Sequence, residues 1–106
     1  MAKEVEPTQE EIEISRTRIP RGPEILGSVE MMLGGDKLRV KCIDGNTRIC
    51  RIPGKLRKRV WIRTGDLVLV EPWNAQSNER ADVIFRYTQT QASWLRRKNY
   101  IKNNAI

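Results

Sequence analysis

The chain has 106 residues, enough for one domain with a modest core and short tails. Its charged fraction of 31% and formal net charge of +7 predict a strongly basic surface, and no apolar run approaches the roughly 20 residues that a membrane-spanning helix needs. The chain does not begin with the basic and then apolar pattern of a signal peptide, so we expect a cytoplasmic protein with no membrane partner.

Residue types that carry most catalysis and metal binding are scarce. The chain has no histidine, which removes the commonest proton-transfer group near neutral pH. Cys42 and Cys50 are too few and too far apart for a zinc site, and the phosphate-loop pattern GxxxxGK[ST] is absent. We therefore expect no enzyme, no catalytic residues, no metal and no cofactor. The two cysteines are expected as buried thiols in a reducing compartment, with a cross-strand disulfide as the alternative.

The first part of the chain is acidic. Residues 1–14 hold five glutamates and one lysine, and a segment of this composition cannot bury enough surface to offset the entropy of ordering. Thr8 and Glu11 have the spacing of a helix cap, but the composition favours disorder. Three arginines follow in a proline-containing stretch, which indicates an extended basic arm. We expect a flexible tail over residues 1–21.

Two strands are predicted next. Residues 24–33 alternate with a period of two, so the odd-numbered positions are expected to face a core. These positions are Ile25, Gly27, Val29, Met31 and Leu33. A Gly-Gly-Asp turn ends this strand, and in residues 37–42 apolar residues alternate with cations that include Arg39 and Lys41. The second strand therefore has an apolar inner face and a cationic outer face.

Turn signals separate the remaining strands. Asp44-Gly45-Asn46 predicts a hairpin turn, and the third strand, residues 47–52, carries Arg48 and Arg51. Pro53-Gly54 ends it. Residues 67–70 are apolar throughout and predict a strand covered on both faces, and residues 81–87 form the last strand.

A helix is predicted after the last strand. Thr88 and Gln91 fit a capping box, and three cations in the final turn suit the helix dipole. Asn99 could close the helix in a left-handed conformation.

These elements predict an all-β fold with an added helix. Five short strands with a long connection between the third and fourth match a Greek-key barrel of the oligonucleotide-binding (OB) type, and an SH3-like barrel is the alternative. We expect the flexible N-terminal tail over residues 1–21, the barrel over residues 22–88, and a C-terminal helix with a short tail over residues 89–106.

Residues 51–63 hold six cations and no acid. A cluster this dense weakens a fold by self-repulsion unless counter-charge comes from elsewhere. Phosphate groups of RNA are one source, and a solvated surface loop is the alternative. Cations on the adjoining strands favour RNA, and nothing resembles a recognition helix for duplex DNA.

The aromatic residues are expected to be mainly structural. Trp61 could stack on a base, but packing at the edge of the barrel is the preferred interpretation. Trp73 and Trp94 are also expected to pack, and Phe85 and Tyr87 are expected to fill the barrel from one face of the last strand.

The segments VKCIDGNTRICRIPG, RIPGKLRKRVWIRTGDLVLVEPW and ADVIFRYTQTQASWL resemble the translation initiation factor 1A family of archaea and eukaryotes. The resemblance extends over about Arg18–Tyr100 and implies an OB barrel that binds the small ribosomal subunit at the A site, promotes initiator tRNA recruitment and helps to select the start codon. It implies ribosomal RNA as the direct partner, and initiator tRNA and other initiation factors as indirect partners. The implied RNA-binding residues are Arg39, Lys41, Arg48, Arg51, Gly54, Lys55, Leu56, Arg57, Lys58, Arg59 and Trp61.

The tails depart from the eukaryotic pattern. Eukaryotic members have a basic N-terminal tail and an acidic C-terminal tail that engages initiation factor 5B, whereas this chain begins with acidic residues and residues 102–106 contain no acid. Tail functions are therefore not carried over. We expect a monomer when the protein is free. The alternative functions are a general single-strand RNA chaperone, an adaptor that binds a protein through the acidic tail and, more remotely, an RNA-processing enzyme.

Overall fold

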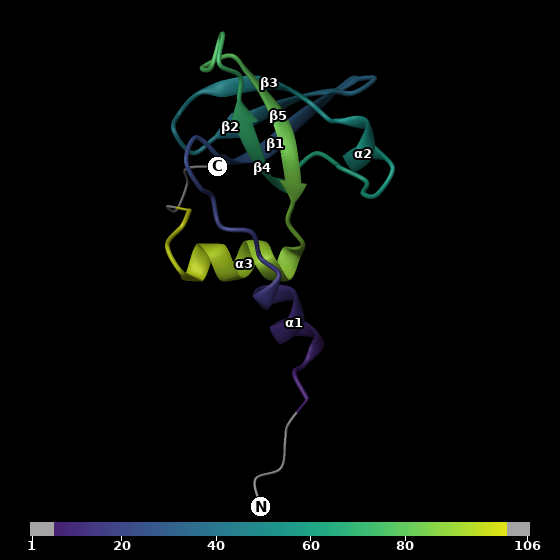
Figure 1. Ribbon diagram of the computed structural model, residues 1–106, viewed down its shortest axis with the longest axis vertical. Helices are drawn as coiled ribbons and strands as arrows, with labels where there is room; N and C mark the ends of the chain where they lie inside the picture. The colour runs from purple at the N-terminus through teal and green to yellow at the C-terminus, as the bar shows by residue number, and fades with distance from the viewer. Residues whose placement is uncertain (1–5, 102–106) are drawn as a thin grey trace, which may run out of the picture.

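The structure, a computed structural model, describes residues 6–101. Five strands close into a barrel in the order β1-β2-β3-β5-β4, with β4 paired back to β1. Helix α3 lies beneath the barrel, α1 lies beneath α3, and α2 projects from one side (Figure 1). The elements are α1 (Gln9–Ser15), β1 (Ile25–Gly34), β2 (Lys37–Cys42), β3 (Thr47–Arg51), α2 (Gly54–Arg57), β4 (Leu67–Pro72), β5 (Arg80–Arg86) and α3 (Gln89–Arg97).

Strands β1, β2 and β3 form an antiparallel meander. Gly45 adopts a φ of 90°, the left-handed conformation that the predicted hairpin turn needs. Strand β1 is interrupted by two register shifts on either side of Met32, and such bulges break the period of two. The prediction that Met31 and Leu33 face a core is therefore wrong: their exposed fractions are 48% and 40%, although Val29 is buried as expected.

Two apolar clusters stabilise the fold. The first fills the barrel interior, and the second lies between the barrel and α3. Strand β4 contributes to both, because its alternate side chains point to opposite faces; Val68 enters the barrel and Leu69 enters the second cluster. The prediction of a strand covered on both faces is confirmed.

The sequence predicted that Phe85 and Tyr87 fill the barrel, and that prediction is wrong. Both belong to the second cluster, where their rings meet edge to face at 4.8 Å. The cause is a register shift between β4 and β5, which pairs Val70 with Val83 but Leu69 with Phe85. The extra residue between Val83 and Phe85 reverses which face the following side chains occupy.

The predicted capping box of α3 is confirmed. Thr88 Oγ1 accepts a hydrogen bond from the Gln91 backbone N–H at 3.2 Å, and Gln91 Oε1 accepts one from the Thr88 backbone N–H at 2.9 Å. Asn99 follows the helix with a φ of 63°, as predicted. Leu95 is fully buried and joins the helix to the second cluster.

The N-terminal segment differs from the disorder that its composition favours. Thr8 Oγ1 accepts a hydrogen bond from the Glu11 backbone N–H at 3.1 Å, so the weaker capping signal at these positions marks a real helix start for α1. Further along, the Tyr87 hydroxyl donates to the Arg18 carbonyl oxygen. The outer parts of both expected tails, residues 1–5 and 102–106, lie outside the described residues, and the domain boundaries stay predictions.

Within residues 6–101, no helix combines the length and the apolar character needed to cross a membrane. The same residues hold no cluster of three or more side chains suited to binding a metal ion.

Candidate RNA-binding surface

The connection between β3 and β4 is anchored to the barrel by its apolar residues. Leu56 and Val60 pack against the barrel core, and Ile62 is only 8% exposed. The sequence predicted a long connection between the third and fourth strands, and the structure shows that this connection contains a short helix, α2, which begins directly after Pro53. Pro53 is the N-cap residue of this helix and has an extended conformation, with φ −59° and ψ 149°, and the helix starts without a side-chain cap. The apolar residues take the inward positions of the connection.

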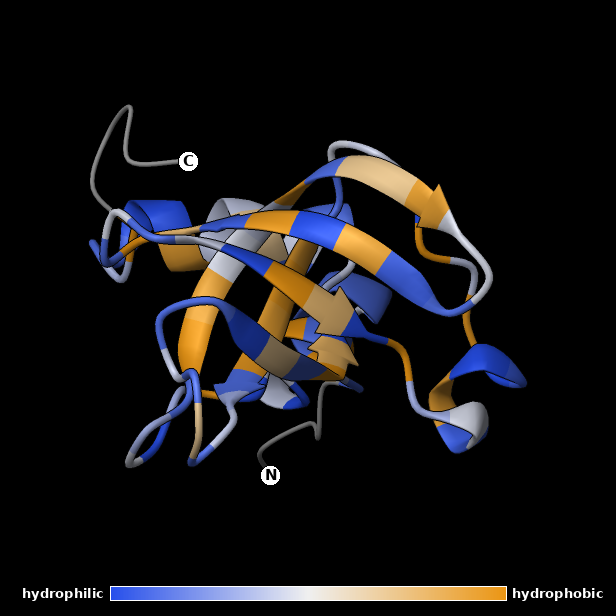
Figure 2. Ribbon diagram, turned by 90° about the horizontal axis from the view of Figure 1, so that it is seen from above, coloured by the Kyte–Doolittle hydropathy of each residue, from blue (hydrophilic) through white to orange (hydrophobic). Residues whose placement is uncertain are grey.

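The cations of this connection point outward. All five are exposed, and no carboxylate within residues 6–101 lies within 4.0 Å of the charged group of any of them. In Figure 2, hydrophilic segments of α2 stand at the side of the barrel, whose strands alternate between hydrophilic and hydrophobic residues. The five residues, hereafter the connection cations, are Lys55, Arg57, Lys58, Arg59 and Arg63. The predicted cluster therefore does form a region of positive charge that the described part of the chain leaves uncompensated.

Three cations on neighbouring strands extend this region. Arg39 and Lys41 lie on the outer face of β2, half-buried and exposed respectively. Arg51 ends β3, and its guanidinium lies 3.3 Å from Asp82, whose second carboxylate oxygen accepts a hydrogen bond from Trp73 Nε1 at 3.0 Å. This pair is exposed, so it holds Arg51 only weakly.

Arg48 does not belong to the exposed basic face, and that prediction is wrong. Its side chain is 2% exposed, because Arg48 shares the inward face of β3 with Cys50. The guanidinium donates to both carboxylate oxygens of Asp44, at 3.1 and 2.8 Å, and Arg48 Nε donates to the Ser77 carbonyl oxygen. These bonds supply within the chain the counter-charge that a buried arginine requires.

Trp61 is not packed at the barrel edge, so the preferred interpretation of that residue is also wrong. It lies between the inward residues Val60 and Ile62, and its exposed fraction is 80%. Arg86 Nη1 donates to the Trp61 carbonyl oxygen at 3.0 Å, which ties this part of the connection to the end of β5. An indole this exposed beside cations is available for stacking on a nucleobase.

The remaining two residues of the implied set have other surroundings. Leu56 is an anchor of the connection, and Gly54 opens α2 with no neighbouring atom that a side chain would meet. Sequence reasoning left out Arg63 and Arg86, which line one hollow with Trp61. Arg63 belongs to the same run of cations and could have been included in the predicted RNA-binding set. Arg86 could not, because it lies 25 positions from Trp61 in the sequence and only the fold brings the two together.

The two cysteines are free and buried, as predicted. Burial raises the pKa of both thiols, that of Cys50 to about 12. Both therefore stay protonated near neutral pH, and a protonated, buried thiol is a poor nucleophile.

An OB barrel that combines an exposed indole with a basic connection whose cations meet no carboxylate within residues 6–101 is typical of nucleic-acid-binding proteins. The family described as "Translation initiation factor 1A / IF-1" matches residues 10–106. The chain belongs to this family, whose members are non-enzymatic translation factors.

Curated relatives and a solved structure agree with this assignment. Translation initiation factor 1A of Methanothermobacter thermautotrophicus is 56% identical over 90 residues, which cover 85% of this chain and 91% of the relative. The Methanopyrus kandleri factor is 59% identical over 85 residues, covering 80% and 76%. The solution structure of the bacterial translation initiation factor 1 from the Wolbachia endosymbiont of Brugia malayi covers 65% of this chain and 82% of its own, with 31% identity and a TM-score of 0.50. The OB fold is therefore confirmed.

Proposed function

We propose that this translation initiation factor binds the small ribosomal subunit at the A site through ribosomal RNA, and so promotes initiator tRNA recruitment and start-codon selection. The observation that carries the proposal is the set of connection cations, which are exposed and unpaired within the described residues. RNA phosphates supply the missing counter-charge.

Binding depends on charge and shape rather than on a chemical step. The cations beside α2 contact phosphates, and Arg39, Lys41 and Arg51 extend the contact across the barrel. Trp61 is the one strongly exposed aromatic residue among the described parts of this surface, so it can hold one unstacked base. With little other stacking area, the protein recognises the path of an RNA backbone more than its base sequence.

A factor held in this way acts by occupying space. It excludes elongator tRNA from the A site while leaving room for initiator tRNA in the neighbouring site. Family membership supports a ribosomal target over unstructured RNA, since the matching relatives are initiation factors.

The test is binding of the purified protein to small ribosomal subunits, followed by chemical probing of the A-site nucleotides. We expect co-sedimentation and protection of those nucleotides. Phosphate contacts by Lys55, Arg57, Lys58 and Arg59 alone give a plot of log affinity against log salt with a slope of about −3, at about 0.7 for each contact, and contacts by the other cations make it steeper. A slope near zero, or protection only outside the A site, contradicts the proposal. Equal affinity for unstructured oligonucleotides favours the RNA chaperone instead.

A further inference from the structure

The outer face of α3 is covered by a segment of the chain itself. One side of α3 packs on the barrel through Leu95, and α1 packs against the helix from below (Figure 1). Gln91 Nε2 donates to the Glu13 carbonyl oxygen at 2.9 Å, and the Arg97 guanidinium lies 4.0 Å from the Glu10 carboxylate. The segment that covers α3 is thus an acidic helix.

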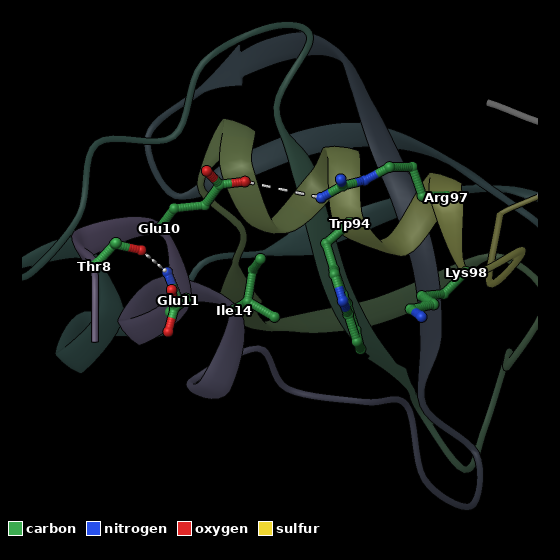
Figure 3. A pocket seen from close by; sticks show the side chains of 7 residues that line it. All are labelled: Thr8, Glu10, Glu11, Ile14, Trp94, Arg97 and Lys98. Atoms are coloured by element: carbon green, nitrogen blue, oxygen red, sulfur yellow. Dashed lines mark hydrogen bonds and ion pairs between the residues drawn. The ribbon is translucent and has the colours of Figure 1, made fainter. Parts of the chain in front are cut away.

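The fit between the two helices is incomplete. A hollow of about 600 Å³ lies between them, with Ile14 and Trp94 directed into it, acidic side chains on the α1 side and Arg97 and Lys98 on the α3 side (Figure 3). A second hollow, of about 520 Å³, includes Glu10 and Arg97 in its lining. Helix α1 therefore leaves room on both sides of its ion pair with α3.

Helix α1 is also weakly held. It has seven residues and none of them is buried, whereas isolated helices need about 12–15 residues to be even marginally stable. Both partners of the Glu10–Arg97 pair are more than 60% exposed, and exposed pairs of this kind contribute little. A competitor with the same chemistry and a longer contact can displace α1.

We propose that the outer face of α3 is a docking site for an acidic amphipathic helix of a partner protein, and that α1 occupies this site in the free chain. Helix α1 shows the recognition chemistry: an apolar side chain beside Trp94, a carboxylate toward Arg97, and a backbone carbonyl that accepts from Gln91. An RNA strand could match the cations, but the segment that covers this face in the structure is an acidic peptide helix, and the proposal follows that chemistry. The site is separate from α2 (Figure 1), so it does not depend on the proposed RNA surface.

The test uses the full chain and a labelled synthetic peptide of residues 6–17 as the competitor. In the full chain, Ile14→Asp removes the apolar side chain of α1 and frees the docking face. We expect the peptide to bind this variant at least about tenfold more tightly than the wild type, because the tethered α1 no longer competes. Fluorescence anisotropy of the peptide measures both affinities. Glu10→Arg, which reverses the exposed pair, is a second variant that releases α1 without touching apolar residues.

Three controls decide the result. Adding Arg97→Glu to the Ile14→Asp variant turns the attraction between Arg97 and the peptide carboxylates into repulsion, so it is expected to weaken peptide binding at least about fivefold. A peptide carrying Glu10→Gln and Glu11→Gln is expected to bind about threefold more weakly, because exposed ion pairs contribute little. Thermal melting confirms that the variants remain folded. Failure of the peptide to bind both released variants, or binding that Arg97→Glu leaves unchanged, overturns the proposal. Tighter binding of a short RNA to the released variants, abolished by Arg97→Glu, assigns the face to RNA and also overturns it.

Discussion

Strand β3 and the connection that follows it are both rich in arginine, yet they use it in opposite ways. Arg48 is buried and makes two hydrogen bonds to the Asp44 carboxylate. Arg57 and Arg59, a few residues further on, are exposed and meet no carboxylate within residues 6–101. The two kinds of cation differ in whether the described part of the chain supplies the counter-charge, and under the proposed function only those without it bind RNA.

The difference has an energetic consequence. Burying the Arg48 guanidinium costs desolvation that only its partners offset, so that site has no capacity left for a ligand. The connection cations remain solvated and repel one another, and a polyanion relieves that repulsion on binding. Replacing cations in the two regions therefore tests two properties, stability in one and affinity in the other.

The largest expected effect follows from reversing charge on the connection. Replacing Lys55, Arg57, Lys58 and Arg59 together with glutamate is expected to abolish binding to the small ribosomal subunit, because four phosphate contacts become four repulsions. The barrel remains folded, since none of these side chains is buried. Sedimentation with small subunits measures the first effect and thermal melting the second.

A matched control carries the same change in net charge elsewhere. Arg16, Arg21, Arg96 and Lys98 are also exposed, and their replacement with glutamate is expected to leave most of the affinity intact. If both quadruple variants lose binding equally, net charge rather than the connection drives the interaction, and the proposed surface is wrong.

The next largest effect concerns stability. Arg48→Met leaves the Asp44 carboxylate and the Ser77 carbonyl without their partner, and we expect a loss of about 2 kcal/mol in the free energy of unfolding. This is less than for a fully buried pair because Asp44 remains 32% exposed. Affinity for the ribosomal subunit should change little. Arg51→Met on the same strand is the control: its pair with Asp82 is exposed, so urea titration should show a loss below about 0.5 kcal/mol.

Most of the fold could be predicted from the sequence, because turn residues and alternating patterns are local signals. The hairpin turn at Gly45 and the capping box of α3 each depend on neighbouring residues, and both were found. The exposure of Met31 and the position of Phe85 depend on bulges that no residue type marks. Pairing across the barrel, not local preference, sets those bulges.

The candidate surface was predicted less completely, for a different reason. A run of cations is visible in any sequence, but the direction of each side chain is not. Arg48 lies in phase with Cys50, and Trp61 lies between two anchors. Strict alternation of inward and outward side chains would have predicted a buried Arg48 and an exposed Trp61. The usual preference of arginine for the surface and of tryptophan for the core predicted the opposite.

Trp61 gives a smaller effect that separates affinity from stability. We expect Trp61→Ala to weaken ribosome binding by about 1–2 kcal/mol, the value of one stacked base, and to change stability by less than about 0.5 kcal/mol, because the indole is 80% exposed. Trp73→Ala is the matched control. It loses a hydrogen bond to Asp82, so it should lower the melting temperature more than it lowers affinity. Filter binding measures the affinities, and thermal melting measures the stabilities. If Trp61→Ala lowers the melting temperature more than Trp73→Ala does, and lowers affinity less, then Trp61 is structural.

The smallest expected effect isolates the charge of Asp44. Hydrogen bonds from Arg48 hold the pKa of this carboxyl below its ordinary value of 3.8. A carboxyl with a lowered pKa in the folded state stabilises the fold fully above pH 3.8, and this contribution is lost as pH falls through the folded-state pKa. Asp44→Asn preserves the shape of the turn but removes the charge, so it should cost about 1 kcal/mol at pH 7. Melting curves recorded from pH 7 to pH 2 should show the gap between wild type and variant closing in acid. If the difference in melting temperature persists at pH 2, the charge of Asp44 is not what stabilises the buried Arg48. The contrast between Arg48, paired within the chain, and the connection cations, which lack such a partner among the described residues, would then be wrong.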